Sequence, residues 1–536
     1  MKHIIALSFI CCFAGSSIAQ EAVQELSKKA KNGYISETDY TGGNYLVTYK
    51  IGGDKKKNEV FYETYLFDKN MKFVKNEEVA APKVSAASMP DKTQTRFNAY
   101  VGGCSSFDAL SMKLKLSTST INTKWDYKKQ RYVYDKTIKS ETIKAKGDNG
   151  KYTGYAAFNG GDDDNLFVIA ATDNKEKKNQ NDFFILSVNS DLDISTKAID
   201  ITGSQSLVYT QQLDNGDVVM VYAPKKTEPD LFNYTYLQYS GKGDLKNKVV
   251  FKSPSTNLLI TNAQEVNGSM FFSGTSTKSN DSFDEVFDDY VAEISNPCYK
   301  EAQNYRDEKW MKKADNKMDN FHMLKFTGNK LNFASTTPIS DFKSKFKTAP
   351  ADKKADAYKG KNFQVNSFYV TGNEEYLVAG QLMSKVKLGA GNPVKSYEDI
   401  ICFYFDKNGQ LKTQFGTEKM NTEKKSEIFP VRQSFRASKD GKSIYWTILE
   451  VKGFKGYDGF VDAYNGDATY RAKFFPRIAR LDLQNNSISN FAILGNEKFY
   501  ISSAFLPMTD KNENSVTYIG NDDDYKKLWL AKYVFE

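Results

Sequence analysis

The feature that most constrains this chain is a hairpin pattern that occurs twice in nearly the same form. The two copies, Tyr65–Phe73 and Ile401–Leu411, each read as an apolar strand, a turn that begins Asp-Lys-Asn, and a second strand. Looser versions recur at 186–194, 237–245, 324–333 and 481–488. Apolar runs bounded by Asp, Asn and Gly are typical of antiparallel hairpins. We therefore expect a fold built from one repeated hairpin unit.

The first complete unit predicts four strands, at Tyr34–Tyr40, Tyr45–Ile51, Val60–Phe67 and Lys72–Val79. A turn rich in Gly, Asn or Asp precedes its second strand. Seven such turns occur along the chain, about 50 to 75 residues apart where no insertion separates them, which is close to the length of a β-propeller blade. The pattern predicts an all-β chain of about seven, between six and eight, four-stranded antiparallel blades.

The two ends of the chain are expected to meet in one sheet. The last unit ends with a strand at 528–535 and has about three strands, so the N-terminal segment 20–33, a short helix or a lead-in strand, can complete it. This pairing would close a propeller ring and remove exposed sheet edges, with an open stack of sheets as the alternative. Insertions are predicted near 80–150 (an eighth blade or a projecting hairpin), near 296–320 (a helix) and near 453–475.

In its repeated hairpins the chain resembles β-propeller repeat proteins in general, over nearly all of residues 20–536, which would then form a single domain. No WD or kelch signature is present, so the resemblance points to no specific family. The richness in Lys, Asn, Tyr and Phe, together with the Ile18-Ala19-Gln20 sequence, resembles exported proteins of Bacteroidota-type bacteria.

Residues 1–19 have the pattern of a signal peptide. Lys2 is followed by an apolar run at 4–14 and by Ser17-Ile18-Ala19, a small-x-small cleavage sequence. A lipoprotein signal with Cys11 or Cys12 is the weaker alternative, because Ile10 stands where a small residue is needed. The protein is expected to be periplasmic or extracellular, or associated with the outer membrane. No other apolar run is long enough to predict a transmembrane segment.

Charge and residue usage argue against several classes of function. A formal net charge of +8 on 536 residues is too mild to indicate a nucleic-acid partner. Outside the signal sequence the cysteines are Cys104, Cys298 and Cys402, so at most one disulfide can form. His322 is the only histidine there, and its place in a strand pattern favours a structural role over a catalytic one. We therefore expect a binding protein in preference to an enzyme.

Acidic clusters leave two alternatives open. The runs Asp162–Asp164 and Asp522–Asp524 and the acids of 281–289 are expected to be solvated turn residues, and no cofactor is predicted, although a loop-bound calcium ion is a weak alternative. A pair of carboxylates could also hydrolyse a glycosidic bond. Two or three acids that converge near an Arg or Tyr in the central channel would favour such a hydrolase.

The predicted binding site is an aromatic loop within the third insertion, 453–475. Its aromatic rings alternate with glycines and acids, an arrangement that offers flat faces to a sugar or a peptide. The alternative is that the rings fold back onto their own sheet. The candidate ligand-binding residues are Tyr457, Asp458, Asp462, Tyr464, Asp467, Tyr470 and Arg471.

Together these features predict a non-enzymatic ligand- or protein-binding scaffold of the bacterial cell envelope, which acts through loops on one propeller face. An envelope protein or a glycan is the expected partner, and the oligomeric state does not follow from the sequence. The alternative function is a carboxylate-dependent glycan hydrolase with its site in the central funnel.

Overall fold

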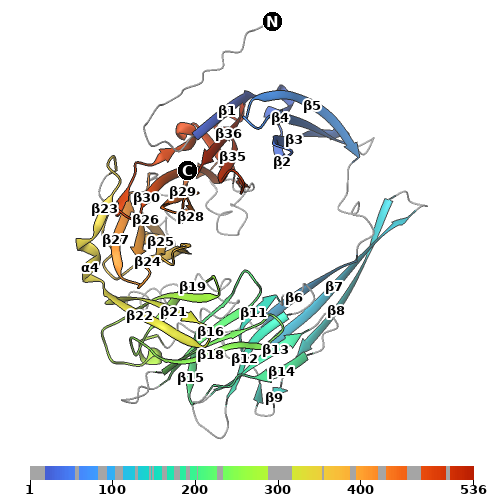
Figure 1. Cartoon of the computed structure of the whole chain (residues 1–536). Helices are drawn as coiled ribbons and strands as arrows, with labels where there is room; N and C mark the ends of the chain where they lie inside the picture. The colour runs from blue at the N-terminus through green and yellow to red at the C-terminus, as the bar shows by residue number, and fades with distance from the viewer. Residues whose placement is uncertain are drawn as a thin grey trace. The chain divides into compact units, whose positions relative to one another are not determined.

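The computed structural model shows an all-β protein made of antiparallel sheets (Figure 1). The residues that it describes are 19–54, 59–82, 93–102, 113–126, 131–143, 146–147, 150–151, 153–159, 166–173, 181–188, 194–201, 203–225, 233–287, 317–352, 355–386, 394–420, 430–454, 472–502 and 507–536. No helix among these residues has the length and apolar character needed to cross a membrane.

The chain forms two compact units, and each is described by itself. The first unit comprises 1–83, 348–353 and 418–536, and the second comprises 84–347 and 354–417. Both are built on the four-stranded meander that the sequence predicts.

The first unit contains the short helix α1 (Lys28–Lys31) and two sheets. One sheet has the order β2-β3-β4-β5, with strands Tyr34–Thr41, Asn44–Asp54, Glu59–Phe67 and Phe73–Pro82. The larger sheet has the order β1-β36-β35-β33-β30-β29-β28, with strands Ala19–Glu25, Lys527–Val534, Ser515–Asp522, Phe499–Ser502, Ala472–Asp482, Ser443–Phe454 and Arg432–Ala437. Two short strands, β31 (Ser487–Ile488) and β32 (Ala492–Ile493), also pair with β30, and β34 (Met508–Asp510) pairs with β35. The 3₁₀ helix η2 (Leu494–Glu497) precedes β33.

The predicted pairing between the two ends of the chain is confirmed. Strand β1 lies antiparallel to β36, with Ala19 opposite Tyr533 and Glu25 opposite Lys527. Strands β34, β35 and β36 are three strands of the last four-stranded repeat, and the N-terminal strand is the fourth. The segment 20–33 therefore forms both elements that the sequence allowed, a lead-in strand followed by α1.

The second unit contains a series of sheets. Strands β11–β14 are Thr153–Asn159, Leu166–Asp173, Asn181–Val188 and Ile194–Ala198; strands β15–β18 are Gln205–Gln212, Val218–Pro224, Asn233–Tyr239 and Leu245–Lys252. Strands β19–β22 are Leu259–Val266, Ser269–Ser276, Asn320–Thr327 and Lys330–Pro338; strands β24–β27 are Phe363–Val370, Tyr376–Val386, Val394–Phe405 and Leu411–Thr417. Each of these four sets forms one meander, and β23 (Phe346–Thr348), which follows α4 (Ser340–Ser344), pairs with β27.

The insertion predicted near 80–150 forms a three-stranded sheet, β6-β7-β8, with strands Thr93–Gly102, Lys113–Asp126 and Arg131–Ile143. A two-stranded ribbon of β9 (Lys146–Gly147) and β10 (Gly150–Lys151) follows it. The helix predicted at 296–320 lies almost wholly outside the described residues. The number of blades and the closure of a ring stay predictions.

The repeated hairpin has the same hydrogen bonds in both copies. Asp68 Oδ1 accepts from the N–H groups of Asn70 and Lys72 at 2.9 and 2.8 Å, and Asp406 Oδ1 accepts from those of Asn408 and Gln410 at 3.0 Å each. The residue at the fourth position of each turn is left-handed, with φ of 58° at Met71 and 71° at Gly409. This is a type I turn closed by a bulge, in which the Asp side chain holds the loop backbone.

Large aromatic side chains fill the cores of both units. In the second unit, Phe321 and Phe403 lie 5.6 Å apart in an edge-to-face arrangement and belong to one buried cluster. Cys402, beside them in sequence, is buried and not in a disulfide, and burial raises the pKa of its thiol. The cysteines at 104 and 298 lie outside the described residues.

His322 is a buried strand residue, as the sequence interpretation expects. Its Nε2 lies 2.8 Å from Ser276 Oγ and its Nδ1 lies 3.1 Å from Thr336 Oγ1. Burial disfavours the charged imidazole and lowers its pKa to about 4. The ring therefore connects three strands of one sheet as a neutral group.

We expect His322 to make the protein less stable in acid. In the unfolded chain its pKa is about 6.5, so between pH 6.5 and 4 the unfolded state binds more protons than the folded state, and the free energy of unfolding falls by about 3 kcal/mol as pH decreases through this window. Urea unfolding of the parent and of His322→Gln, measured from pH 7 to 4, checks this. The parent should lose more stability than the variant, and parallel pH curves would contradict the assignment.

Candidate functional site

The predicted binding loop lies outside the described residues. All seven of its candidate residues fall within 455–471. The strands on either side are described: β29 ends at Phe454 and β30 begins at Ala472, and these two residues are opposite each other in the ladder. The segment therefore connects the second strand of its meander to the third. Its role in binding stays a prediction.

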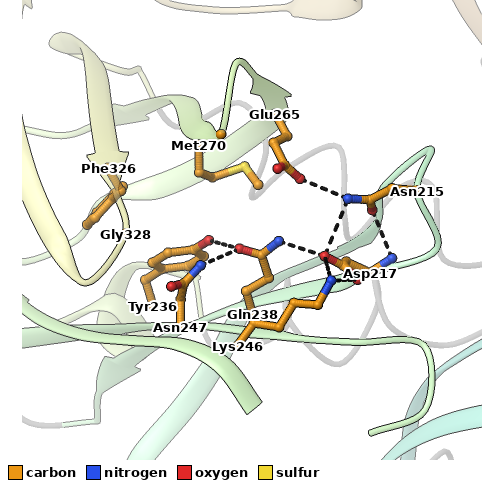
Figure 2. A pocket seen from close by; sticks show the side chains of 11 residues that line it. Asn215, Asp217, Tyr236, Gln238, Lys246, Asn247, Glu265, Met270, Phe326 and Gly328 are labelled. Carbon is orange, nitrogen blue, oxygen red and sulfur yellow. Dashed lines mark hydrogen bonds and ion pairs between the residues drawn. The ribbon is translucent and has the colours of Figure 1, made fainter. Parts of the chain in front are cut away.

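A polar pocket of about 180 Å³ lies in the second unit, between the sheets β15–β18 and β19–β22 (Figure 2). Its lining residues come from both sheets: Asn215, Asp217, Tyr236, Gln238, Lys246, Asn247, Glu265, Gly268, Met270, Phe326 and Gly328. It lies at the strand ends that carry the turns between first and second strands. The loops between second and third strands, among them the aromatic loop predicted to bind, leave the opposite strand ends because the strands are antiparallel.

Asp217 is the buried charge of this pocket, with a side chain only 5% exposed. Lys246 Nζ donates to both of its oxygens, at 2.6 and 2.7 Å, and Gln238 Nε2 donates to Oδ2 at 2.9 Å (Figure 2). The Lys246 side chain is itself 48% exposed. A buried carboxylate is tolerated when it is paired and hydrogen-bonded in this way, so Asp217 is held in place by three donated hydrogen bonds.

Gln238 is fixed at both ends of its amide group. Its Oε1 accepts from Tyr236 Oη at 2.9 Å and from Asn247 Nδ2 at 2.8 Å, while its Nε2 donates to Asp217. Burial, with a smaller contribution from the Glu265 charge, raises the pKa of Tyr236 well above its usual value, so the phenol stays a neutral donor. The floor of the pocket is therefore a connected hydrogen-bond network with defined directions.

Asn215 joins the two sheets across the pocket. Its Nδ2 donates to Glu265 Oε2 at 3.1 Å and, more weakly, to Asp217 Oδ2 at 3.4 Å, and its Oδ1 accepts from the backbone N–H of Asp217 at 3.0 Å. Glu265 is exposed. Because both carboxylates accept from the same amide group, they lie within two hydrogen-bond lengths of each other.

The next junction between neighbouring sheets, that of β19–β22 and β24–β27, shows which side chains stand at the positions that line the pocket. The strand registers match Asn247 with Phe333, since Gln238 is opposite Asn247 and Lys325 is opposite Phe333. Glu265 is opposite Met270 in one sheet, and Val370 is opposite Tyr376 in the next. Met270 therefore corresponds to Tyr376. Glu265 likewise corresponds to Val370. Gly268 then corresponds to Glu374, two residues before Tyr376. The pocket thus has a smaller or more polar side chain at each of these four positions.

In that second junction the same space is filled. The rings of Phe333 and Tyr376 lie 6.3 Å apart, and Tyr376 is fully buried. Val370 is 4% exposed, and Glu374 reaches back to Lys325 with an ion pair of 2.6 Å. The fold therefore does not require a pocket between neighbouring sheets. The one beside Asp217 exists because of its own side chains.

The sequence interpretation recognised this region only as turns. Asn215-Gly216 and Asn267-Gly268 belong to two of the seven turns that precede second strands, and the pocket lies between these two turns. The signal that could have identified it is a comparison of repeats at matched register, which places Asn247 against Phe333. That comparison needs the bulge positions, which the sequence does not display.

A second group of acids, this one beside an arginine, lies in the first unit. Arg477 pairs with Glu450 and also donates to Asp352 Oδ2 and the Glu418 carbonyl, at 3.3 and 3.2 Å. Glu450 is fully buried, and its Oε2 accepts from the Met420 N–H at 2.8 Å. Its carboxylate is enclosed by protein donors, so the group fastens chain segments to β29 and β30 and offers no surface to a substrate.

The acidic run 522–524 leads into a turn, as expected. The expectation of turn residues is wrong for Asp284 and Glu285, which lie in a short helix at 283–287, where Glu285 Oε2 accepts from the Ser282 N–H and Oγ at 2.7 and 2.8 Å. Asp522 Oδ1 accepts from the N–H groups of Lys526 and Lys527 at 2.7 and 2.9 Å, and Asp523 and Asp524 pair with lysines. The run 162–164 and the residues 288–289 lie outside the described part of the chain. In the part that is described, no three acidic, histidine or cysteine side chains gather in a way that could hold a metal ion.

Comparison with known proteins gives no family. No protein-family model and no curated protein matches this chain. Among solved structures, similarity is found to a lignostilbene dioxygenase of Pseudomonas brassicacearum, with 9% identity over 83% of this chain and 90% of that one and a TM-score of 0.34. An α-L-arabinofuranosidase of Fusarium graminearum matches with 10% identity over 71% of this chain and 93% of that one, at a TM-score of 0.26. At TM-scores this low, neither likeness assigns an activity to this chain.

Proposed function

We propose that this chain is a non-enzymatic binding protein of the bacterial cell envelope, built on repeated four-stranded sheets of the β-propeller type. The observation that carries the proposal is the pocket beside Asp217, which the neighbouring junction shows to be dispensable for the fold. Ligand sites are preformed cavities in which a few fixed polar groups orient the ligand, and this small polar cavity supplies such groups. The predicted signal peptide supports a location in the envelope.

The aromatic loop 455–471 is retained in this proposal as a second contact region. It connects β29 to β30 and carries Tyr457, Tyr464 and Tyr470 with interleaved acids. Exposed tyrosines are typical contact residues for proteins and sugars.

The glycan hydrolase is the second candidate, because Asp217 and Glu265 accept from one amide group. A hydrolase of this kind needs one carboxyl group that carries a proton and a second that stays charged. Lys246 donates to both oxygens of Asp217, and Glu265 is exposed at the rim. Neither carboxyl group has the surroundings of a general acid, which favours binding over hydrolysis.

Filling the pocket should abolish binding without unfolding the protein. The double variant Asn247→Phe/Met270→Tyr introduces the side chains of the neighbouring junction, so we expect it to stay folded, at a cost of about 1 to 3 kcal/mol in the free energy of unfolding for the added volume. Its retention of components from an envelope extract, measured by mass spectrometry, should fall at least about tenfold, a loss of about 1.4 kcal/mol in binding.

The control for this variant is Phe333→Asn in the filled junction. It removes a partly buried ring that packs against the core and should cost about 2 kcal/mol in the free energy of unfolding, less than the loss of a fully buried ring. If the double variant keeps every bound component, the pocket is not the binding site. If the parent protein releases sugars from the extract and Glu265→Gln does not, the hydrolase replaces the binding proposal.

The loop prediction has its own test. Changing Tyr457, Tyr464 and Tyr470 to Ala should remove at least one envelope component from the pull-down while leaving the thermal midpoint of the protein unchanged, because loop tips contribute little to stability. Retention of all components by this triple variant would leave the pocket as the sole contact region.

A further inference from the structure

We propose that the pocket between β15–β18 and β19–β22 binds one neutral sugar residue of a glycan. This inference rests on the proposed binding function and adds the chemical class of the ligand. It is drawn from the charges, the unused hydrogen-bonding atoms and the size of the pocket.

The charges of the pocket disfavour ionic ligands. Asp217 and Glu265 contribute two negative charges and Lys246 one positive charge, so an anion would enter against a net negative field. A cation would meet the Lys246 ammonium, which is half exposed at the pocket and already satisfies Asp217. A neutral polar ligand avoids both penalties.

The apolar groups of the pocket are too deeply buried to attract an apolar ligand. Tyr236 and Phe326 are each 1% exposed and Met270 is 3% exposed. Since hydrophobic stabilisation is proportional to the apolar area removed from water, a hydrocarbon ligand would gain little here. The pocket therefore selects ligands by hydrogen bonding.

Three side chains of the pocket retain hydrogen-bonding capacity within the described residues. Glu265 uses only Oε2, in its bond from Asn215, and Asn247 uses only its Nδ2, in its bond to Gln238. Lys246 has three protons on Nζ and donates only to Asp217. Two acceptors and one donor in the lining of one pocket suit the several hydroxyl groups of a sugar, because each hydroxyl can donate to a carboxylate or carbonyl oxygen and accept from an ammonium.

The rigidity and size of the pocket agree with a single sugar ring. Asn215 and Gln238 have both amide ends engaged, so the polar floor is fixed before a ligand arrives, which reduces the entropic cost of binding. A volume of about 180 Å³ is small for a ligand pocket and suits one ring better than two. The rest of a glycan would extend into solvent over the exposed Glu265.

The direct test is a titration of the full chain, by calorimetry or saturation-transfer NMR, with methyl glycosides of glucose, galactose and mannose. At least one should bind, with a Kd in the millimolar range that a few hydrogen bonds provide. Glucuronic acid and glucosamine should bind at least about tenfold more weakly than the neutral glycoside of the same ring, since each adds one unfavourable charge.

Variants localise the binding to this pocket. Glu265→Ala removes one of the two free acceptors and should weaken binding of the neutral glycoside about tenfold. Its control is Glu374→Ala, which removes an acidic side chain from the filled junction and should leave the affinity unchanged. An equal effect of both variants, tighter binding of glucuronic acid or glucosamine, or no binding of any neutral glycoside would overturn the assignment of a sugar.

The failure of this inference is distinguishable from failure of the proposed function. If no glycoside binds but the pocket-filling variant still loses a component of the envelope extract, the protein binds through this pocket a ligand of another class. If that variant loses nothing, the binding function of the pocket itself is rejected.

Discussion

The structure depends on the register of its hairpins. In the two clearest copies one aspartate, Asp68 or Asp406, accepts from two backbone N–H groups of its turn and so fixes the length of the loop. Because successive side chains point to opposite faces, a shift of one residue would move the whole apolar set of a strand to the wrong face. The turn therefore decides which side chains of a strand meet the next sheet.

This constraint makes the functional proposal possible. Once the register is fixed, each junction between sheets presents matched positions, and a change of side chain there alters the space without altering the fold. Phe333 and Tyr376 fill one junction, while Asn247 and Met270 leave a pocket in the one before it. A repeated scaffold can thus gain a ligand site by losing packing at one place.

The strands and the ends of the chain were predictable because their signals are local or periodic. The meander over 34–79 and the pairing of β1 with β36 follow from apolar alternation and from counting strands. The pocket was not predictable, because it joins Asn215 to Glu265, residues far apart in sequence whose meeting depends on how two sheets pack. The aromatic loop 455–471 was predicted from composition, and its role remains a prediction.

The central claim is that the pocket beside Asp217 is a ligand site which the corresponding junction lacks. Hydrogen exchange measured by mass spectrometry, with and without a glycan fraction from the envelope, tests it most directly. We predict slower exchange in the turns at 213–217 and 266–269 when the glycan is present, and unchanged exchange in the corresponding turn at 371–375. Equal protection of all three turns, or protection of none of them, would contradict the claim.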